Sequence, residues 1–392
     1  MAEAYIVGAL RTATGKKGGR LSTIHPIDLG AMVIDGLIDQ VGIDPQAVDD
    51  VIFGCVSQNS AQAGNIARNV ALSSKLGESV PGVTIDRQCG SAQQAIHFAA
   101  QAVMSGTQDV VIAGGVESMS TVPMFSNVLD GLDKGRGKPK GQRLEERYPG
   151  IEFSQFSGAE LLAKKYNLTR EELDQFGYQS HIKAAAATKS GKFRQEILPI
   201  ELTLADGSAF IHDEDEGIRG NATIEAMRGL LPMAAGGMVT PGSASQISDG
   251  SAAVMIANEQ AVKKYGLKPR ARIHGLAVVG SDPVIMLEGP IPATLKVLER
   301  TGLTIDDIDL YEVNEAFGPV PLAWAKAVGA DMNKLNVNGG AQANGHPLGC
   351  TGAKLMTTLL NELERRKLRY GLLAICEGGG TANATIIERL DS

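Results

Sequence analysis

Apolar residues along the chain fall into short continuous runs and into longer stretches in which they recur every three or four positions. Runs such as "DVVIAGGV" (109–116) and "SAAVMIA" (251–257) are bounded by glycine or polar residues, which is typical of buried strands. The stretch "CGSAQQAIHFAAQAVMSG" (89–106) has helical spacing and ends at a glycine, and "GCTGAKLMTTLLNELERRK" (349–367) predicts a second helix. The pattern therefore predicts an α/β protein.

The two ends of the chain repeat one arrangement of elements. The segments "GIDPQAVDDVIFGCV" (42–56) and "GLTIDDIDLYEVNEA" (302–316) both place a helix-ending glycine, an acidic pair and a strand-like run in the same order. Each predicted long helix is then followed by an apolar strand that runs into a polar or glycine-rich end, at 109–118 and at 370–383. We therefore expect a duplicated α/β unit in which helices cover largely apolar sheets.

The middle of the chain has a different texture. From residue 119 to residue 248 the sequence is turn-rich, charged and irregular, so we expect an inserted loop domain there. The predicted division is 1–118 plus 249–270 for the amino-terminal half, 119–248 for the loop domain and 271–392 for the carboxyl-terminal half. A basic run in the insertion is open to two interpretations, a solvated loop or a positive patch for a polyanionic ligand; its members are Lys134, Arg136, Lys138, Lys140 and Arg143.

Composition excludes several classes of protein. With 392 residues, 43% of them hydrophobic and 21% charged, the chain has the composition of a folded globular protein. No apolar run approaches the roughly 20 residues of a membrane span, and a net charge of −7 gives no general attraction for nucleic acid or anionic membranes. The ends carry no recognisable targeting segment, so we expect a cytoplasmic protein.

The cysteines and histidines supply the candidate chemistry. Cys89 stands at the start of a predicted helix, where unpaired backbone N–H groups and the helix dipole favour a thiolate and hence a nucleophile. His97 is eight residues further along that helix, about 12 Å away, which is too far for it to act as the base. His346 lies in the glycine-rich "NGGAQANGHPLGCTG" and is the preferred base, although an incidental histidine in a glycine-rich loop is the alternative.

Two further polar residues follow predicted strands. Cys376 ends an apolar strand before "EGGG", and Asn314 follows another strand, where its amide can orient water or bond an oxyanion. A buried core cysteine and a strand-end cap are the structural alternatives. Cys55 and Cys350 are interpreted as structural, and the absence of a CxxC motif or His/Cys cluster argues against zinc.

These motifs, taken in order, resemble the thiolase family, the acetyl-CoA C-acyltransferases. The resemblance spans essentially the whole chain and includes "GGVESMS" (114–120), "NEAF" (314–317), "GGAQANGHPLGCTGAK" (339–354) and "CEGGGTANA" (376–384). It implies a thiolase-like duplicated five-layer α/β/α/β/α core with an inserted loop domain, usually in a homodimer or homotetramer. It also implies acyl-CoA and CoA as substrates, with coenzyme A as co-substrate and neither metal nor redox cofactor.

The same resemblance assigns roles to individual residues. Cys89 would take the acyl group, His346 would activate it and polarise a thioester carbonyl with a water held by Asn314, and Cys376 would move the proton at the α-carbon of acetyl-CoA. Backbone N–H groups of Cys89 and Gly378 would form an oxyanion hole. The remaining implied positions line the pantetheine tunnel or the acyl pocket: Ser245, Ala316, Phe317 and Met286.

Departures from the family pattern bear on the substrate. Short-chain acetoacetyl-CoA thiolases carry a His-Met-Gly segment where this chain has Ser154 and Gln155, and Met286 is followed by Leu287 and Glu288 instead of small residues. Leu231 replaces the arginine of an Arg-Pro pair, which removes one expected contact to the CoA nucleotide. We therefore expect degradative thiolysis of a chain longer or bulkier than acetoacetyl, as in fatty acid or lipid degradation.

Other functions stay open at this stage. A biosynthetic acetoacetyl-CoA thiolase is the first alternative. A decarboxylating condensing enzyme or an inactive acyl-CoA carrier of the same fold is less favoured, because all four candidate residues are present and the decarboxylating enzymes have no second catalytic cysteine. A Cys/His/Asn hydrolase would leave Cys376 and the duplication without explanation.

Overall fold

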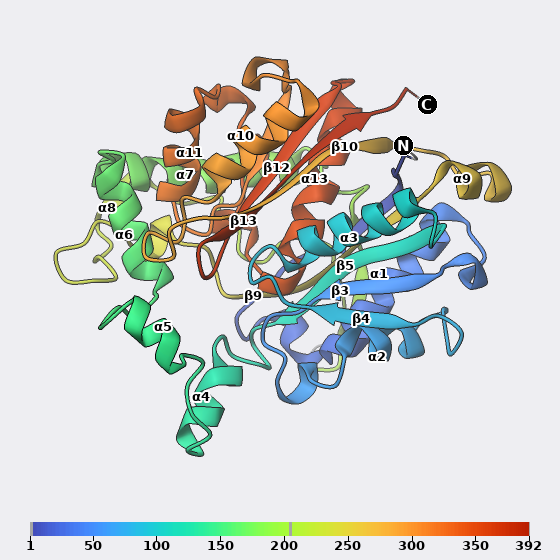
Figure 1. Cartoon of the computed structure of the whole chain (residues 1–392), viewed down its shortest axis with the longest axis horizontal. Helices are drawn as coiled ribbons and strands as arrows, with labels where there is room; N and C mark the ends of the chain where they lie inside the picture. The colour runs from blue at the N-terminus through green and yellow to red at the C-terminus, as the bar shows by residue number, and fades with distance from the viewer. Residues whose placement is uncertain (1–2, 204–205, 392) are drawn as a thin grey trace.

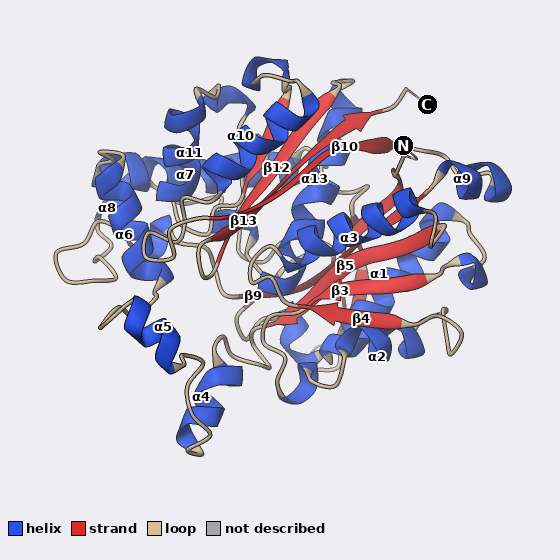
Figure 2. Cartoon of the chain, in the orientation of Figure 1, coloured by secondary structure: helices blue, strands red, loops and turns tan. Residues whose placement is uncertain are grey.

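The computed structural model describes residues 3–203 and 206–391. Its main feature is a twisted mixed sheet in which the strands follow the order β11-β12-β13-β10-β1-β9-β5-β3-β4 (Figures 1 and 2). The sheet divides in the middle, because β1 and β10 pair through only Tyr5 with Arg272 and Ile6 with Ala271. On either side of this narrow contact lies one half of the core.

The main path of the amino-terminal half-sheet has five strands, and the two-residue strand β2 (Gly15–Lys16) pairs with β9 beside it. Its central strand β5 (Val110–Ser118) runs parallel to β3 (Asp50–Gly54), which pairs in parallel with the edge strand β4 (Gly82–Ile85). On the other side β9 (Ser248–Ala257) is antiparallel both to β5 and to β1 (Tyr5–Thr12). The helices of this half are α1 (Pro26–Val41), α2 (Ile66–Ser73) and α3 (Ser91–Ser105), with α9 (Glu259–Tyr265) after β9.

The carboxyl-terminal half repeats this arrangement. Strand β12 (Tyr370–Glu377) is parallel to β11 (Leu310–Val313) and antiparallel to β13 (Thr381–Arg389), which is antiparallel to β10 (Ala271–Gly280). Its helices are α10 (Pro290–Thr301), α11 (Pro319–Val328) and α13 (Thr351–Arg366), with the short α12 (Ala341–Asn344). Asp50 pairs with Val111 and Leu310 with Gly371, so equivalent residues are separated by a constant 260 positions.

Five layers result from this duplication. Helices α3 and α13 contact each other and lie between the two half-sheets, where α3 packs on β3 and β5 and α13 packs on β11 and β12 (Figure 1). Helices α1 and α2 cover the outer face of one half-sheet, and α10 covers that of the other beside α11. Alanines on α3 such as Ala92, Ala95 and Ala99 are fully buried, and their small side chains permit this close packing. The duplicated α/β architecture expected from the sequence is confirmed.

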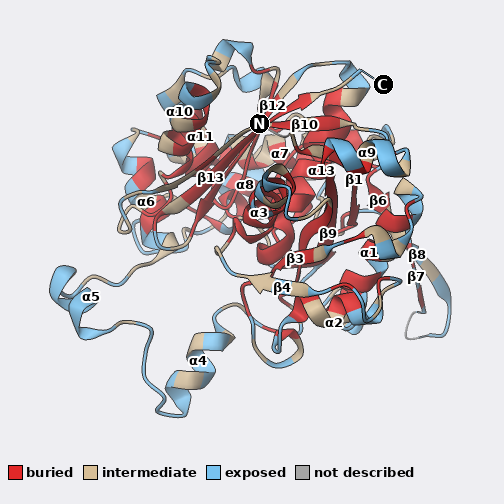
Figure 3. Ribbon diagram, turned by 45° about the vertical axis from the view of Figure 1, so that its right-hand side comes forward, coloured by how far each residue is buried: buried red, intermediate tan, exposed pale blue. Residues whose placement is uncertain are grey.

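The segment between β5 and β9 is a long excursion from the core. It contains α4 (Ser126–Asp133), α5 (Gln142–Arg147), α6 (Gln155–Lys165), α7 (Arg170–Lys189) and α8 (Ile224–Arg228), with the short strands β6 (Ile197–Leu198), β7 (Ile200–Thr203) and β8 (Ala209–His212). Figure 3 shows α4 and α5, which flank most of the basic run, extending away from the body. Helix α6 returns to pack on α11, and β6 pairs with β1, so the excursion covers one end of both halves.

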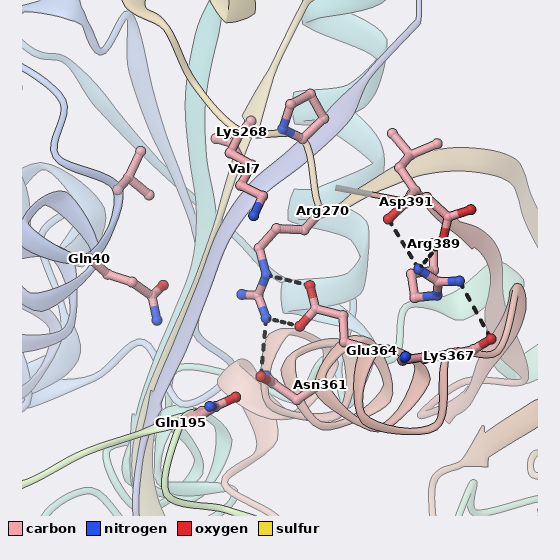
Figure 4. Close-up of a pocket in the computed structure, with 13 residues that line it drawn as sticks. Val7, Gln40, Gln195, Lys268, Arg270, Asn361, Glu364, Lys367, Arg389 and Asp391 are labelled. Atoms are coloured by element: carbon pink, nitrogen blue, oxygen red, sulfur yellow. Dashed lines mark hydrogen bonds and ion pairs between the residues drawn. The ribbon is translucent and has the colours of Figure 1, made fainter.

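None of the helices in 3–203 and 206–391 combines the length and apolar character needed to cross a bilayer. A cavity of about 820 Å³ opens at the seam of the two halves (Figure 4). Its charged lining residues come from the segment before β10, from α13 and the residue after it, and from the end of β13 and the segment after it: Lys268, Arg270, Glu364, Lys367, Arg389 and Asp391. Those charges are largely paired with one another, Arg270 with Glu364 and Arg389 with Asp391. The catalytic candidates from the sequence do not line this cavity.

Candidate active site

Cys89 lies in the tight connection between β4 and α3. The preceding residue, Gln88, has a positive φ of 49°, and α3 begins at Ser91 after the cap residue Gly90. A side chain at Gly90 would collide with the carboxylate of Glu377, so glycine is required where the two halves meet. The Cys89 side chain is only 7% exposed.

Burial changes the expected acidity of the nucleophile. Desolvation raises the pKa of the Cys89 thiol to about 12, and the neighbouring Glu377 adds to the rise. The prediction that the helix start alone lowers this pKa is therefore wrong, because the loss of water outweighs the backbone dipoles. Cys89 is a thiol at neutral pH, so it would need a base to act as the predicted nucleophile.

His346 is held through its backbone N–H, which donates to the Ser248 hydroxyl at 3.3 Å, and through its ring, which contacts Thr351 at the start of α13. Its Nδ1 lies 2.6 Å from the Thr351 hydroxyl, which also lies 2.8 Å from the carbonyl of Pro347. A hydroxyl has one proton, so Thr351 donates to Pro347 and accepts from Nδ1–H. This leaves the lone pair on Nε2, to which the Asn314 amide donates at 3.3 Å.

The imidazole is neutral in this environment. Burial lowers the pKa of His346 to about 3, and the positive charge of buried Lys354 contributes. A neutral ring with a lone pair on Nε2 is the form that can accept a proton. Gly345 has a φ of 82°, and a side chain there would meet Ser248 and Thr14, which explains one glycine of the loop.

Asn314 stands directly after β11, where its backbone N–H donates to the carbonyl of Ala374 at 3.0 Å. Its side-chain Oδ1 is buried and has no hydrogen-bond partner within the described part of the chain. A buried open acceptor next to a histidine is a place for a water or a polar ligand atom.

Cys376 is the second thiol of the site. It is 1% exposed near the end of β12, and burial raises its pKa well above the usual value, with further rises from Cys89 and Glu377. Gly378, two residues later, packs against the side chain of Gln88, which directly precedes Cys89. The backbone after Cys376 therefore lies beside the side chain of the residue that precedes Cys89.

A cavity of about 440 Å³ reaches His346 from the surface. Ser245, Ala316 and Phe317 line it, and the N–H of Ser245 donates to the carbonyl of Ala316 at 2.9 Å. Met286 does not line it; this residue is 4% exposed and packs beneath α6 against Gly158. Three of the four residues predicted to line the pantetheine tunnel or the acyl pocket therefore lie on this wall, and Met286 does not.

The remaining wall was not identified from the sequence. Phe156 of α6 packs edge to face on Phe317, with ring centroids 5.6 Å apart, and Met119, Met124 and Met233 complete an apolar surface with Leu348. Lys16, Lys17 and Arg219 lie on the same cavity and bring positive charge to it. The methionines come from irregular segments without periodicity, so the sequence offered no signal that they share a wall.

The other cysteines and His97 are structural. Cys55 and Cys350 are buried to within 1%, and burial raises the pKa of both thiols. His97 is fully buried in α3, where its Nε2 lies 2.7 Å from the Thr385 hydroxyl. It does not line the cavity of about 440 Å³ beside His346.

Comparison with known proteins agrees with this architecture. Residues 4–260 match the family model "Thiolase, N-terminal domain" and residues 267–389 match "Thiolase, C-terminal domain". A steroid 3-ketoacyl-CoA thiolase of Mycobacterium tuberculosis is 55% identical over 392 residues, covering 100% of this chain and 95% of that protein. A 3-ketoacyl-CoA thiolase of Pseudoalteromonas translucida is 42% identical and covers 98% of each chain.

A solved structure gives the same result for the fold. The crystal structure of the Bacillus anthracis acetyl-CoA acetyltransferase superposes with a TM-score of 0.90 at 38% identity, covering 100% of this chain and 99% of that one. The family models together span nearly the whole chain. The protein therefore belongs to the thiolase family and is an acyltransferase that uses acyl-CoA and CoA.

Proposed function

We propose that the protein cleaves 3-ketoacyl-CoA substrates bulkier than acetoacetyl-CoA by thiolysis. The observation that carries this proposal is the cavity of about 440 Å³ beside His346, whose wall consists of large apolar side chains. Methionines are flexible and adapt to irregular apolar shapes, which suits a fused-ring or branched acyl group. The 55% identity to a protein described as a steroid 3-ketoacyl-CoA thiolase supports the same substrate class.

The first half-reaction forms an acyl-enzyme. Nε2 of His346 accepts the Cys89 proton, and the sulfur attacks the C3 carbonyl carbon of the substrate. When the resulting alkoxide collapses, the C2–C3 bond breaks and its electron pair forms the enolate of acetyl-CoA. Cys376 donates its proton to C2 of that enolate, which leaves acetyl-CoA, the acylated Cys89 and a Cys376 thiolate.

The second half-reaction transfers the acyl group to CoA. The Cys376 thiolate removes the proton of the CoA thiol, and the CoA sulfur attacks the thioester carbonyl on Cys89. The N–H groups of Cys89 and Gly378 bind the oxyanion that forms, and its collapse releases the Cys89 sulfur, which recovers its proton from His346. Asn314, with its open Oδ1, holds the water that assists His346 at the other carbonyl.

The cavity also provides for the CoA portion of the substrate. Ser245, Ala316 and Phe317 line the path of the pantetheine arm. Lys16, Lys17 and Arg219 supply positive charge for the CoA phosphates, which compensates for Leu231 in place of an arginine.

A competition experiment tests the substrate class. The enzyme is mixed with free CoA and equimolar acetoacetyl-CoA and ring-bearing 3-ketoacyl-CoA, and the loss of each is followed by mass spectrometry. We expect the ring-bearing substrate to disappear first as acetyl-CoA appears. Preferential loss of acetoacetyl-CoA would instead favour the acetyl-CoA acetyltransferase activity for which the Bacillus anthracis protein is described.

We also propose that the chain acts as a homodimer, alone or as the unit of a homotetramer. The edge strand β4 leads directly into the Cys89 connection, and Val83 on it is 44% exposed. An open strand edge next to a catalytic residue is stabilised by pairing with a second copy. Light scattering at micromolar concentration should report at least twice the mass of 41.1 kDa, and a monomer would contradict this proposal.

A further inference from the structure

Glu377 is a buried acidic residue that the reaction steps above do not use. It directly follows Cys376 at the end of β12 and is fully buried. One carboxylate oxygen, Oε2, accepts a hydrogen bond from the Thr381 hydroxyl at 2.7 Å. The other, Oε1, is buried without a partner in the described part of the chain and packs against Gly90, the residue after Cys89.

The equivalent residue of the other half shows how a structural glutamate is held. Glu117 lies 260 positions earlier, at the same point of β5. Its carboxylate accepts from the N–H groups of Val56 and Ser57 at 2.9 Å, from that of Gly349 at 2.8 Å and from Gln62 at 3.0 Å. Burial raises the pKa of Glu117 as well, but four donors oppose that rise, whereas Glu377 has one hydroxyl and an open oxygen.

The open oxygen lies among groups that must carry charge during the reaction. Cys89 precedes Gly90, against which the carboxyl packs, and Cys376 is the adjacent residue of the strand. The other charged groups that act on Glu377 are Arg87, which favours its ionisation, and Asp86, which opposes it. Burial outweighs both and raises the pKa of Glu377 to about 8, so the carboxyl group is protonated at neutral pH.

We propose that Glu377 is a positioning residue for thiolysis: its neutral carboxyl group permits Cys89 and Cys376 to carry negative charge in turn, and its ionised form suppresses both thiolates. The inference rests on the proposed roles of the two cysteines. In the first half-reaction Cys376 becomes a thiolate when it protonates the enolate, and Glu377 retains its own proton throughout. A second negative charge at this buried place would oppose that step by Coulomb repulsion.

The test compares the wild-type enzyme with Glu377→Gln, which keeps the shape of a neutral carboxyl group but cannot ionise. Alkylation of Cys89 by iodoacetamide is followed by peptide mass spectrometry, and thiolysis turnover is measured, both from about pH 6.5 to about pH 9.5 around the Glu377 pKa. We expect the variant and the wild type to agree within about twofold at the acid end and to differ by tenfold or more at the alkaline end, with the variant faster. Glu377→Leu, also neutral, provides the same comparison if the glutamine variant does not fold.

Glu117→Gln is the matched control, since it removes a carboxylate at the equivalent place. This variant should be less stable to heat because it loses acceptors for backbone N–H groups, and its ratio to wild type should not change with pH. A constant ratio for both Glu377 variants across the pH range would overturn the inference while leaving the thiolase function intact. Absence of thiolysis by the wild type at every pH would instead contradict the proposed function itself.

Discussion

The amino-terminal and carboxyl-terminal halves of the core share one backbone arrangement but differ where the reactive groups stand. Helices α3 and α13 are the equivalent inner helices of the two halves. The residue two positions before the start of α3 is Cys89, and the residue two positions before the start of α13 is Gly349. The strand positions differ in the opposite sense. There the amino-terminal half has Gly54 and Val116, and the carboxyl-terminal half has the candidate site residues Asn314 and Cys376.

The glycines explain why the chemistry is divided in this way. A side chain at Gly54 would collide with the carbonyl of Gly349, so the amino-terminal half has no space where Asn314 stands in the other. His346 lies in the connection from Leu335 to Thr351, which is longer than the equivalent connection from Gly82 to Ser91. The duplication supplies two frames, and the proposed site combines Cys89 of one with His346 and Cys376 of the other.

The largest effect on turnover is expected at Cys89, whose counterpart in the other half is Gly349. Cys89→Ala should lower thiolysis by at least about 10⁴-fold with little change in stability, because the acyl-enzyme cannot form. Gly349→Ala should act in the opposite way and destabilise the fold by about 2 kcal/mol, since its side chain would press on Cys55 and Glu117. Turnover kinetics and thermal unfolding of both variants measure the two effects. Near-normal turnover by Cys89→Ala would contradict the role of Cys89 as nucleophile.

Substitutions at Cys376 and at its counterpart Val116 should affect the reaction steps differently. We expect Cys376→Ser to lower thiolysis of a 3-ketoacyl-CoA by about 10³-fold while a simple acyl-CoA still acylates Cys89. The weaker acid and base impairs proton transfer at C2, a step that acylation by acyl-CoA does not include. Val116→Ser at the equivalent buried position should cost about 1 to 3 kcal/mol of stability and leave the ratio of acylation to turnover unchanged. Quenched-flow mass spectrometry resolves the two steps, and equal loss of both in Cys376→Ser would contradict the role.

The two glutamates should differ in the sign of their effect on stability. The pKa of Glu377 is raised from 4.5 to about 8, so the native state binds this proton more tightly and loses stability as pH rises through that window. Glu377→Gln should therefore unfold at higher denaturant than the wild type at pH 8, by on the order of 3 kcal/mol, and show a weaker pH dependence. Glu117→Gln should lose about 2 kcal/mol. Urea titrations from about pH 4.5 to about pH 8 measure the free energy of unfolding of each variant. A Glu377→Gln variant less stable than the wild type at pH 8 would contradict the raised pKa of Glu377.

The smallest effect concerns the acyl pocket. Met124→Trp reduces the space along the cavity wall, so turnover of a ring-bearing 3-ketoacyl-CoA should fall about tenfold relative to acetoacetyl-CoA. Met332→Trp is the control, because Met332 is 40% exposed and lies outside this cavity. An unchanged substrate ratio in Met124→Trp would place the acyl group elsewhere.

The sequence predicted those parts of the molecule that depend on local pattern. The strand runs, the helix ending at Gly106 and the repeated order of elements are written in short stretches, and the family motifs located Cys89, His346 and Cys376. The acidity of Cys89 was not predictable, because desolvation depends on packing between segments far apart in the chain. Met286 has a positive φ of 60° and turns into the core, which no spacing indicated.

Glu377 shows the same limit more clearly. Its sequence context, between a cysteine and three glycines, indicated a backbone-rich loop and drew attention to its neighbours. Its significance depends on a missing set of donors, which becomes visible only beside the saturated Glu117 of the other half. The donors around each glutamate come from segments far apart in the chain, so a local sequence pattern does not reveal the difference between Glu117 and Glu377.

The most direct test of the account traps the acyl-enzyme. Wild-type enzyme is mixed with a ring-bearing 3-ketoacyl-CoA without free CoA, so that the acyl group has no acceptor, and the peptides are analysed by mass spectrometry within the first turnover. The account predicts release of acetyl-CoA and an acyl group of the expected mass on the peptide that contains Cys89. An unmodified Cys89 peptide, or an adduct on another cysteine, would contradict the claim that Cys89 is the residue through which this enzyme cleaves its substrate.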